Sequence, residues 1–442
     1  MARRVHVIGA GLAGLAAAVQ LQQRGAQVVL HEAAEHAGGR CRSYYDGTLG
    51  ATIDNGNHFV LSGNHATLGY ARAIGAAGEL VGPSQPEFPF VDLANGRRWT
   101  VRLTPGRLPL WIFDAAARVP DTQPADYLSL APLFFAKPGR TMAQTMRCDG
   151  ILWDRLLRPL FLAALNVEPR QGTAELAAAV ARETLAAGGQ ACRPLVARNG
   201  LGSAFVDPAL RLLQHGGAAI KLGSRLAVIV FADAAKEGAA TGAASSTANG
   251  LTANARVAAL NFADGTSIAL EPGESVVLAV PSEVAQTLVP GVRVPDRFSS
   301  VVNAHFAVEP PHGLPPLTGL VNGTAEWIFA FDGRLSVTVS GADRLLDTPR
   351  DALAKTIWAE VAKAVSLPAD PMPTWQIVIE KRATFAALPS QEMLRPATRT
   401  RWNNLVLAGD WTATGLPATI EGAIRSGQKA AETLLNQPMN RR

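Results

Sequence analysis

VHVIGAGLAGLAAAVQLQQRGAQVVLHE, residues Val5 to Glu32, is the stretch that decides the fold we expect for this chain. Its first apolar residues favour a buried strand, which ends at a glycine turn that fits GxGxxG, Gly9 to Gly14. A segment rich in Ala, Leu and Gln predicts the next helix, Gly25 stops it, and a second strand follows at Gln27 to His31. This order predicts the first unit of a dinucleotide-binding domain.

The three glycines of this turn have separate steric roles. Gly9 permits the tight turn, Gly11 lets the backbone approach a pyrophosphate without a colliding Cβ, and Gly14 lets the helix lie against the strand. The free N–H groups at the helix N-terminus favour phosphate without a basic side chain. Glu32 lies 18 residues beyond Gly14, where a carboxylate accepts hydrogen bonds from an adenosine ribose. Together these features predict a nucleotide site.

The length of 442 residues predicts two or three domains. Hydrophobic residues make up 48% of the chain and charged residues only 17%, which suggests an apolar ligand or a membrane face. The net charge of +5 fits either a basic rim on anionic lipid headgroups or a soluble protein that is merely basic. Because no basic block is interleaved with aromatic residues, we expect no nucleic-acid partner.

Three cysteines, Cys41, Cys148 and Cys192, are odd in number and far apart, so we expect neither a disulfide framework nor a metal site. The N-terminus enters its first strand by residue 5 and has no features of a signal peptide. Because no run of about 18 uncharged apolar residues occurs, we expect no membrane-spanning helix. A reducing cytoplasm fits this pattern.

The segment that follows Glu32 distinguishes the chain from nicotinamide dehydrogenases. It reads AAEHAGGR, Ala33 to Arg40, and resembles the flavin signature of the amine oxidase and phytoene desaturase superfamily. The resemblance implies that its glycines approach the FAD diphosphate and that Arg40 adds positive charge there. Ile53 to Phe59, IDNGNHF, resembles the DxGxH segment of the superfamily, which passes close to the isoalloxazine. His58 in this segment is either an acid or base or a hydrogen-bonded structural histidine.

The C-terminal end carries the second strong signal. Asn404 to Trp411, NLVLAGDW, predicts a strand that ends in Gly-Asp, and Gly415 to Gly427, GLPATIEGAIRSG, predicts a helix. The resemblance implies that Asp410 holds the ribityl and diphosphate region of FAD. It also implies that the helix starting near Ala418 points its N–H groups at the flavin pyrimidine, which stabilises the anion of reduced flavin.

The same end narrows the resemblance. GDWTATGLPATIEGAIRSG, Gly409 to Gly427, resembles the squalene-associated FAD branch of the superfamily, whose members are hydroxysqualene dehydroxylases. This implies reductive removal of the hydroxyl of hydroxysqualene to give squalene, a C30 isoprenoid on a bacterial route toward hopanoids. Lys381 to Phe385 and Arg395-Pro396 also resemble this branch, and we interpret their basic residues as solvated charges.

We expect an α/β fold in which a Rossmann-type FAD-binding domain carries an inserted mixed α+β substrate domain. The FAD-binding domain is expected at residues 1–81, 195–289 and 395–442, and the substrate domain at 82–194 and 290–394. From Gly82 to Gly188 we expect apolar and helical segments in place of strands. Ser275 to Pro281, SVVLAVP, predicts a further buried strand, and Ala263 to Gly265 predicts a hairpin turn. Ala232 to Asn254, composed mainly of small residues, is expected to be a hairpin insertion without chemistry.

Two apolar segments of the substrate domain are too short to span a membrane, Leu108 to Phe113 and Tyr127 to Phe135. They are either core or the apolar mouth of a lipid tunnel that rests on a bilayer. With the second interpretation we expect a cytoplasmic protein, peripheral on the inner face of the cell membrane, with Trp111 and Phe113 in contact with lipid.

One further segment of that domain, Ile151 to Asn166, predicts a helix kinked at Pro159, with Asp154 and Arg158 paired at i,i+4. Such a kinked apolar helix either lines a cavity or packs as ordinary core.

The implied reaction needs a proton donor, because hydroxide is a poor leaving group and the allylic C–O bond must be weakened while flavin N5 delivers hydride to carbon. His58 and Asp54 are the catalytic candidates by position, and a bound water is the alternative. The sequence identifies no electron donor for the flavin.

Three other functions stay open. A carotenoid desaturase of the phytoene type uses the same fold to remove hydrogen from a polyene. An amine oxidase requires an aromatic cage and usually a lysine beside the flavin, and neither is evident. A prenyl-lipid-binding escort protein on this fold would have lost its flavin, and the intact Glu32, Gly409 and Asp410 argue against that loss.

FAD is the expected cofactor, and no metal is expected. Gly216 to Leu226 resembles the middle FAD segment of the superfamily, in which the backbone near Leu226 lies against the adenine. The residues expected to bind FAD are Gly9, Gly11, Leu12, Ala13, Gly14, Glu32, Ala33, Gly38, Gly39, Arg40, Gly56, Asn57, His58, Leu226, Gly409, Asp410, Pro417, Ala418, Thr419 and Ile420.

Overall fold

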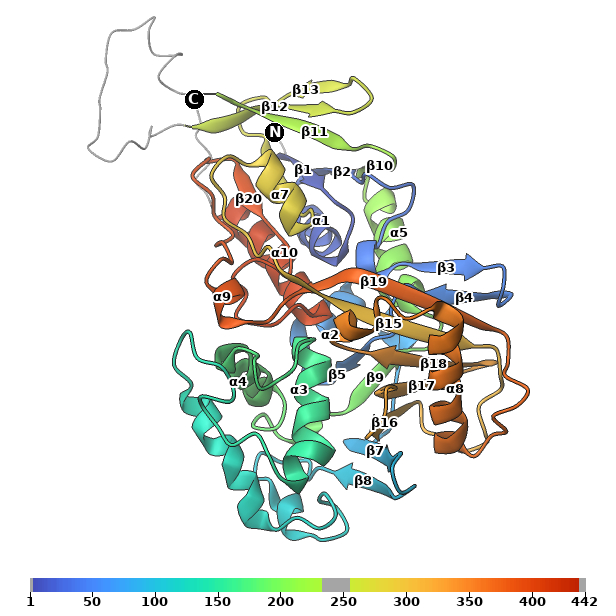
Figure 1. The fold of residues 1–442 in the computed structure, drawn as a ribbon. Coiled ribbons are helices and arrows are strands. Elements are labelled where there is room, and N and C mark those ends of the chain that lie inside the picture. The colour runs from blue at the N-terminus through green and yellow to red at the C-terminus, as the bar shows by residue number, and fades with distance from the viewer. Residues whose placement is uncertain (1–2, 233–254, 437–442) are drawn as a thin grey trace, which may run out of the picture.

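The computed structural model describes residues 3–232 and 255–436, and Figure 1 shows two connected regions. The region at the top of Figure 1 holds both ends of the chain, and the strands and helices below it come mainly from the middle. The insertion expected from Ala232 to Asn254 lies outside the described residues, apart from Ala232 itself. No helix within these ranges is long and apolar enough to cross a membrane.

A five-stranded parallel sheet forms the centre of the upper region. Its order is β10 (Ala219–Lys221), β2 (Gln27–His31), β1 (Arg4–Ile8), β14 (Ser275–Leu278) and β20 (Leu405–Leu407). Val5 and Val7 of the central strand are fully buried, because neighbouring strands and helices cover both faces. The sequence pattern predicts four of these strands. It misses β10, an edge strand of only three residues with little apolar character.

Two helices pack against this sheet and against each other, α1 (Leu12–Gln23) and α10 (Ile420–Leu435). Their backbones lie so close together that a Cβ added at Gly427 would be only 2.0 Å from the Ala13 carbonyl oxygen. The first and last helices of the described residues therefore lie side by side next to the glycine turn.

A small antiparallel sheet covers the upper end of this region (Figure 1). It consists of β11 (Leu226–Ala232), β12 (Arg256–Phe262) and β13 (Ser267–Ala269). The hairpin turn expected at residues 263–265 is confirmed by the pairing of β12 with β13. Three helical elements lie in the segments of chain just before β10 and just after β14. They are η7 (Gly202–Val206), α5 (Asp207–His215) and α7 (Ser282–Leu288).

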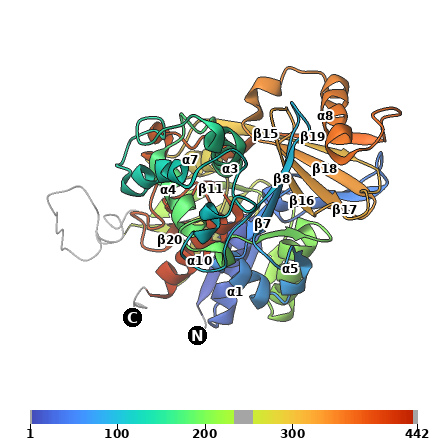
Figure 2. The same ribbon diagram turned by 90° about the horizontal axis from the view of Figure 1, so that it is seen from below.

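A seven-stranded mixed sheet forms the second region. Its order is β19 (Trp375–Phe385), β15 (Phe298–Phe306), β18 (Arg334–Val339), β17 (Trp327–Phe331), β16 (Leu317–Val321), β7 (Glu87–Asp92) and β8 (Arg98–Arg102). Alternate residues such as Val302 and Val337 bury one face under α8 (Arg350–Val365). Figure 2 shows α8 on this side of the sheet and α1, α5 and α10 on the other.

The strands β7 and β8 correct the expectation that no strands occur between Gly82 and Gly188. Glu87–Asp92 contains Pro89 and reads weakly as a strand, yet it pairs in parallel with β16. This partner lies far along the chain, so a local pattern does not reveal the pairing.

Helical segments fill the lower part of Figure 1: η3 (Leu110–Phe113), η4 (Pro124–Phe135), the π-helical turn η5 (Trp153–Leu157), α3 (Arg158–Leu165) and α4 (Ala174–Glu183). The expected pair of Asp154 with Arg158 is wrong, because Arg158 binds Glu168 at 2.9 Å. The π-helical turn changes the spacing on which the i,i+4 argument depends.

Trp111 corrects the expected membrane contacts. Its side chain is 6% exposed and packs edge-on against Tyr127, with ring centroids 5.1 Å apart. Phe113, two residues later, is 67% exposed. Trp111 is therefore a core residue, and the lipid-facing interpretation applies to its neighbours only.

Short elements complete the described chain. They are β3 (Ser43–Asp46), β4 (Ala51–Asp54), β5 (Phe59–Leu61), β6 (Leu80–Val81), β9 (Pro194–Ala197), α2 (His65–Ala73), α9 (Pro389–Glu392), η1 (Gly39–Cys41), η2 (Ala77–Glu79), η6 (Gly189–Ala191) and η9 (Ala342–Leu345).

Candidate functional site

The glycine turn after β1 shows which of its glycines the fold itself requires. Gly9 has φ +103°, and a Cβ there would lie 2.4 Å from the Ala279 carbonyl oxygen. A Cβ at Gly14 would lie 1.8 Å from the Gly9 carbonyl oxygen. At Gly11, in contrast, a Cβ would meet nothing within 4 Å. The described chain therefore leaves open space beside Gly11, where a pyrophosphate is expected, next to Leu12 and Ala13 at the start of α1.

Glu32 lies immediately after β2 and binds the backbone around the turn. One carboxylate oxygen accepts a hydrogen bond from the Ala10 N–H at 2.7 Å, and the other accepts one from the Ala34 N–H at 2.9 Å. The Ser224 N–H donates to the Glu32 carbonyl oxygen at 2.8 Å. This bond brings the segment before Leu226 to the same edge of the sheet, so the expected ribose and adenine contacts are neighbours.

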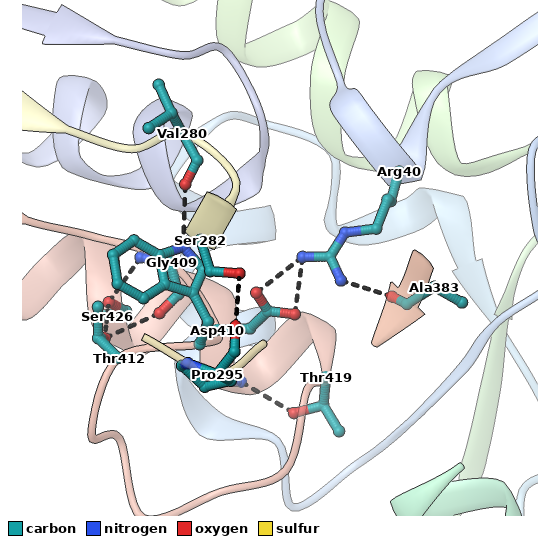
Figure 3. Close-up of polar contacts among 12 residues, drawn as sticks. Arg40, Val280, Ser282, Pro295, Ala383, Gly409, Asp410, Thr412, Thr419 and Ser426 are labelled. Carbon is teal, nitrogen blue, oxygen red and sulfur yellow. Dashed lines mark hydrogen bonds and ion pairs between the residues drawn. The ribbon is translucent and has the colours of Figure 1, made fainter. Parts of the chain in front are cut away.

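Arg40 and Asp410 form the central ion pair of the site (Figure 3). One terminal nitrogen of Arg40 lies 2.7 Å from each carboxylate oxygen of Asp410, and the other donates to the Ala383 carbonyl oxygen on β19. The carboxylate of Asp410 raises the pKa of Arg40 above its ordinary value. The pair joins the GGR turn, where Gly38 and Gly39 have positive φ, to the C-terminal motif.

The loop after β20 holds Asp410 in place (Figure 3). The Gly409 N–H donates to Ser426 Oγ at 2.9 Å, and the Trp411 indole N–H donates to the Val280 carbonyl oxygen at 2.9 Å. Pro417 and Ala418 then lead to α10, whose first turn is capped by Thr419: its Oγ1 accepts from the Gly422 N–H at 3.0 Å. The helix begins at Ile420, and its N-terminus lies in this loop region as expected.

His58 combines solvent access with a strongly lowered pKa. Its side chain is exposed, yet loss of solvation, with a smaller effect of the Arg40 charge, lowers its pKa to about 4. Arg40 is likewise 44% exposed although protein surrounds it. His58 and Arg40 therefore border one solvent-accessible space, in which the Arg40 charge acts on the His58 imidazole.

An asparagine that sequence reasoning missed joins this space to the substrate sheet. Asn303, on β15, accepts through Oδ1 from the Asn57 backbone N–H at 3.1 Å and from Thr338 Oγ1 at 2.9 Å. A Cβ at Gly56 would lie 3.4 Å from Asn303 Nδ2 and 3.5 Å from His58 Nε2, so both groups border the same turn. A polar Asn within the apolar run VVNAHF is the signal that points to it.

Asp54, the second candidate proton donor, is 2% exposed. Its Oδ1 accepts hydrogen bonds from Ser43 Oγ at 2.5 Å and from the Leu201 N–H at 2.8 Å, while burial raises its pKa. These bonds tie the β3–β4 hairpin to the start of η7, which is a structural role.

Arg395 corrects the interpretation as a solvated charge. Its side chain is fully buried, and its guanidinium donates to the carbonyl oxygens of Asp410 and Thr412. Lys381 and Arg382 of the other basic segment are exposed, as expected. The difference arises because the backbone carbonyls that receive Arg395 come from a loop beyond its own segment.

The residues present fit FAD. Open space lies beside Gly11, a positive helix terminus lies at each end of the site, and Arg40 supplies positive charge between them. The buried Asn57 Oδ1 receives no hydrogen bond from the described residues. These features leave room and hydrogen-bonding capacity for a dinucleotide with a polar ring edge.

Comparison with known proteins shows the family of the chain. The family model described as flavin containing amine oxidoreductase matches residues 12–435. A hydroxysqualene dehydroxylase of Rhodopseudomonas palustris is 51% identical over 98% of this chain and 99% of that protein. One of Sinorhizobium fredii is 50% identical over 99% of both. A putrescine oxidase structure superposes with a TM-score of 0.66 at 17% identity, covering 99% of this chain and 100% of the other, and shows the same fold. The chain therefore belongs to the flavin-containing amine oxidoreductase family and is an FAD-dependent oxidoreductase.

Proposed function

We propose that this chain reductively removes the hydroxyl of hydroxysqualene and so produces squalene. The observation that carries the proposal is the identity of 50–51% over nearly the whole length to proteins named for this activity. The reaction breaks the C–O bond, forms a C–H bond and releases water, and it consumes one hydride and one proton. Bound FAD in its reduced form supplies the hydride chemistry.

We propose that FAD is held by the residues expected from the sequence. Glu32, Ala33 and Leu226 contact the adenosine end. The diphosphate is contacted by the glycine turn after β1 and by the GGR turn that contains Arg40. Asp410 serves the ribityl chain, and residues 417–420 with Gly56 to His58 serve the ring. The contacts that support this arrangement are the Arg40–Asp410 pair and the backbone bonds of Glu32.

The same contacts limit the roles of the two acid candidates. Loss of solvation and the Arg40 charge lower the pKa of His58 to about 4, which favours the neutral imidazole near pH 7. Asp54 is occupied by Ser43 and the Leu201 N–H. Neither residue is therefore assigned the transferred proton.

We propose the same division into domains as expected from the sequence. Every strand of the parallel sheet comes from residues 1–81, 195–289 or 395–442. Every strand of the seven-stranded sheet comes from 82–194 or 290–394. This membership supports a discontinuous FAD-binding domain with an inserted substrate domain.

We also propose that η3, η4 and the residues around them contact the surface of a bilayer. Five large apolar side chains are exposed here: Leu108 70%, Leu110 58%, Phe113 67%, Leu128 71% and Phe135 83%. In η4 the side chains of Tyr127 and Leu133 point inward and are buried. A helix that is apolar on both sides suits a lipid contact. Exposed basic residues flank the two segments, Arg107 on one side and Lys137 and Arg140 on the other, which suits anionic headgroups.

The test of the proposed activity uses purified holoprotein without oxygen, with the flavin reduced chemically before substrate is added. Hydroxysqualene should give squalene and reoxidise the flavin in a single turnover. If reduced protein leaves hydroxysqualene unchanged while oxidised protein dehydrogenates squalene or phytoene, the protein is a desaturase instead. If the purified protein is colourless and cannot be reconstituted with FAD, the alternative of a prenyl-lipid-binding escort protein is favoured instead.

A further inference from the structure

The loop that carries Asp410 is held from behind by one buried arginine. Arg395 lies between α9 and β20, and none of its side chain is exposed. A buried guanidinium is unfavourable unless all its nitrogens find acceptors. Here Nε donates to the Thr412 carbonyl oxygen at 3.0 Å, and Nη2 donates to the Asp410 carbonyl oxygen at 3.0 Å and to Thr414 Oγ1 at 2.7 Å.

The third nitrogen and the face of the guanidinium connect to the substrate domain. Nη1 lies 2.8 Å and 3.1 Å from the two carboxylate oxygens of Glu392, on α9. The guanidinium stacks 4.8 Å from the ring centre of Phe385, the last residue of β19. Arg395 therefore joins α9 and the edge strand β19 of the seven-stranded sheet to the loop that follows the parallel sheet.

The direction of the Asp410 carbonyl group determines the direction of the N–H group of the next residue, Trp411. A trans peptide points its C=O and its N–H to opposite sides. Since the Asp410 carbonyl points at Arg395, the Trp411 N–H points away from it, and within the described ranges it has no acceptor. The Asp410 carboxylate is paired with Arg40, and within the described residues Arg395 binds only the backbone oxygen of Asp410. One anchored peptide thus presents a donor and a carboxylate together.

We propose that Arg395 is a positioning residue for FAD: it orients the peptide between Asp410 and Trp411 so that the carboxylate and the N–H face the cofactor. The carboxylate accepts from hydroxyls of the ribityl chain, and the N–H donates to an oxygen of the cofactor. The proposal rests on the assignment of FAD to this site and not on the identity of the substrate.

The test compares the Arg395→Met variant with Arg382→Met, which removes an exposed arginine bound to Glu283. Folding of each apoprotein is checked by far-ultraviolet circular dichroism, and FAD affinity by quenching of flavin fluorescence. Arg395→Met should raise the FAD dissociation constant at least tenfold and make the flavin midpoint potential more negative. Arg382→Met should change neither.

Two further variants keep the test decisive if Arg395→Met does not fold. Arg395→Lys keeps the charge but cannot reproduce the planar fork, so its affinity should be intermediate. Thr414→Val removes only one acceptor of the guanidinium and should weaken FAD binding slightly. Folded Arg395→Met or Arg395→Lys that binds FAD within twofold of the wild type, with an unchanged potential, would overturn the proposal, whatever the activity toward hydroxysqualene.

Discussion

In the first glycine turn, the fold requires Gly14, whereas we expect the bound cofactor to require Gly11. A Cβ at Gly14 meets the Gly9 carbonyl at 1.8 Å, whereas a Cβ at Gly11 meets nothing within 4 Å. We expect Gly14→Ala to lower the melting temperature of the apoprotein by at least several degrees. Gly11→Ala should leave that temperature within about a degree and weaken FAD binding at least tenfold. Thermal unfolding and FAD titration measure both, and normal FAD affinity in Gly11→Ala would contradict the expected pyrophosphate position.

A buried histidine makes stability depend on pH. Burial, with the charge of Arg334, lowers the pKa of His305 to about 3, while Asp46 acts in the opposite sense. Between pH 6.5 and about 3 the unfolded chain binds a proton that the folded chain does not, so stability falls as the solution becomes more acidic. One such proton gives a slope of about 1.4 kcal/mol per pH unit.

His305→Gln should remove about one proton from this slope. Denaturant unfolding of the apoprotein at pH 7, 6 and 5 measures it, and the same replacement at the exposed His36 is the control. An unchanged slope in His305→Gln would show that another group causes the acid sensitivity.

At the scale of elements, the proposed membrane contact rests mainly on exposed side chains of η4. Leu128→Ser with Phe135→Ser changes exposed side chains, so folding and FAD binding should be unaffected, while flotation with vesicles containing anionic lipid should fall severalfold. Trp111→Ser is the contrasting variant, because it removes a core contact with Tyr127 and should destabilise the region. Equal flotation of the double variant and the wild type would remove η4 from the membrane proposal.

At the scale of the whole molecule, the site that we propose for FAD is built from segments near both ends of the chain. Arg40 and Asp410 come from opposite ends and meet at 2.7 Å, so FAD should stabilise the folded chain as a unit. Saturation at about 100 times the dissociation constant should add about 2.7 kcal/mol. Asp410→Ala should lose most of this increment in thermal unfolding with and without FAD. The exposed Asp114→Ala should keep it, and full stabilisation of Asp410→Ala would contradict the assigned role.

The glycine turn, the role of Glu32 beside it and the strand that ends in Gly-Asp could be predicted from the sequence alone. Each of these depends on sterics and hydrogen bonds within a few residues, and their spacing is visible in the letters. The strands from Val5, Gln27, Ser275 and Leu405 followed from short apolar runs, which are typical of a sheet covered on both faces.

Only the tertiary structure decided the positions whose partners lie far along the chain. Arg395 looked like a solvated charge, because the acceptors that hold it in the interior include the backbone carbonyls of Asp410 and Thr412, which no side-chain letter encodes. Asn303 needed the pairing of β15 with β18 to meet Asn57 and Thr338. Trp111 and Phe113 share one apolar run, and only packing against Tyr127 buries the first and leaves the second exposed. The composition of a segment does not show which of its side chains are buried, because burial depends on the residues that the fold packs against each of them.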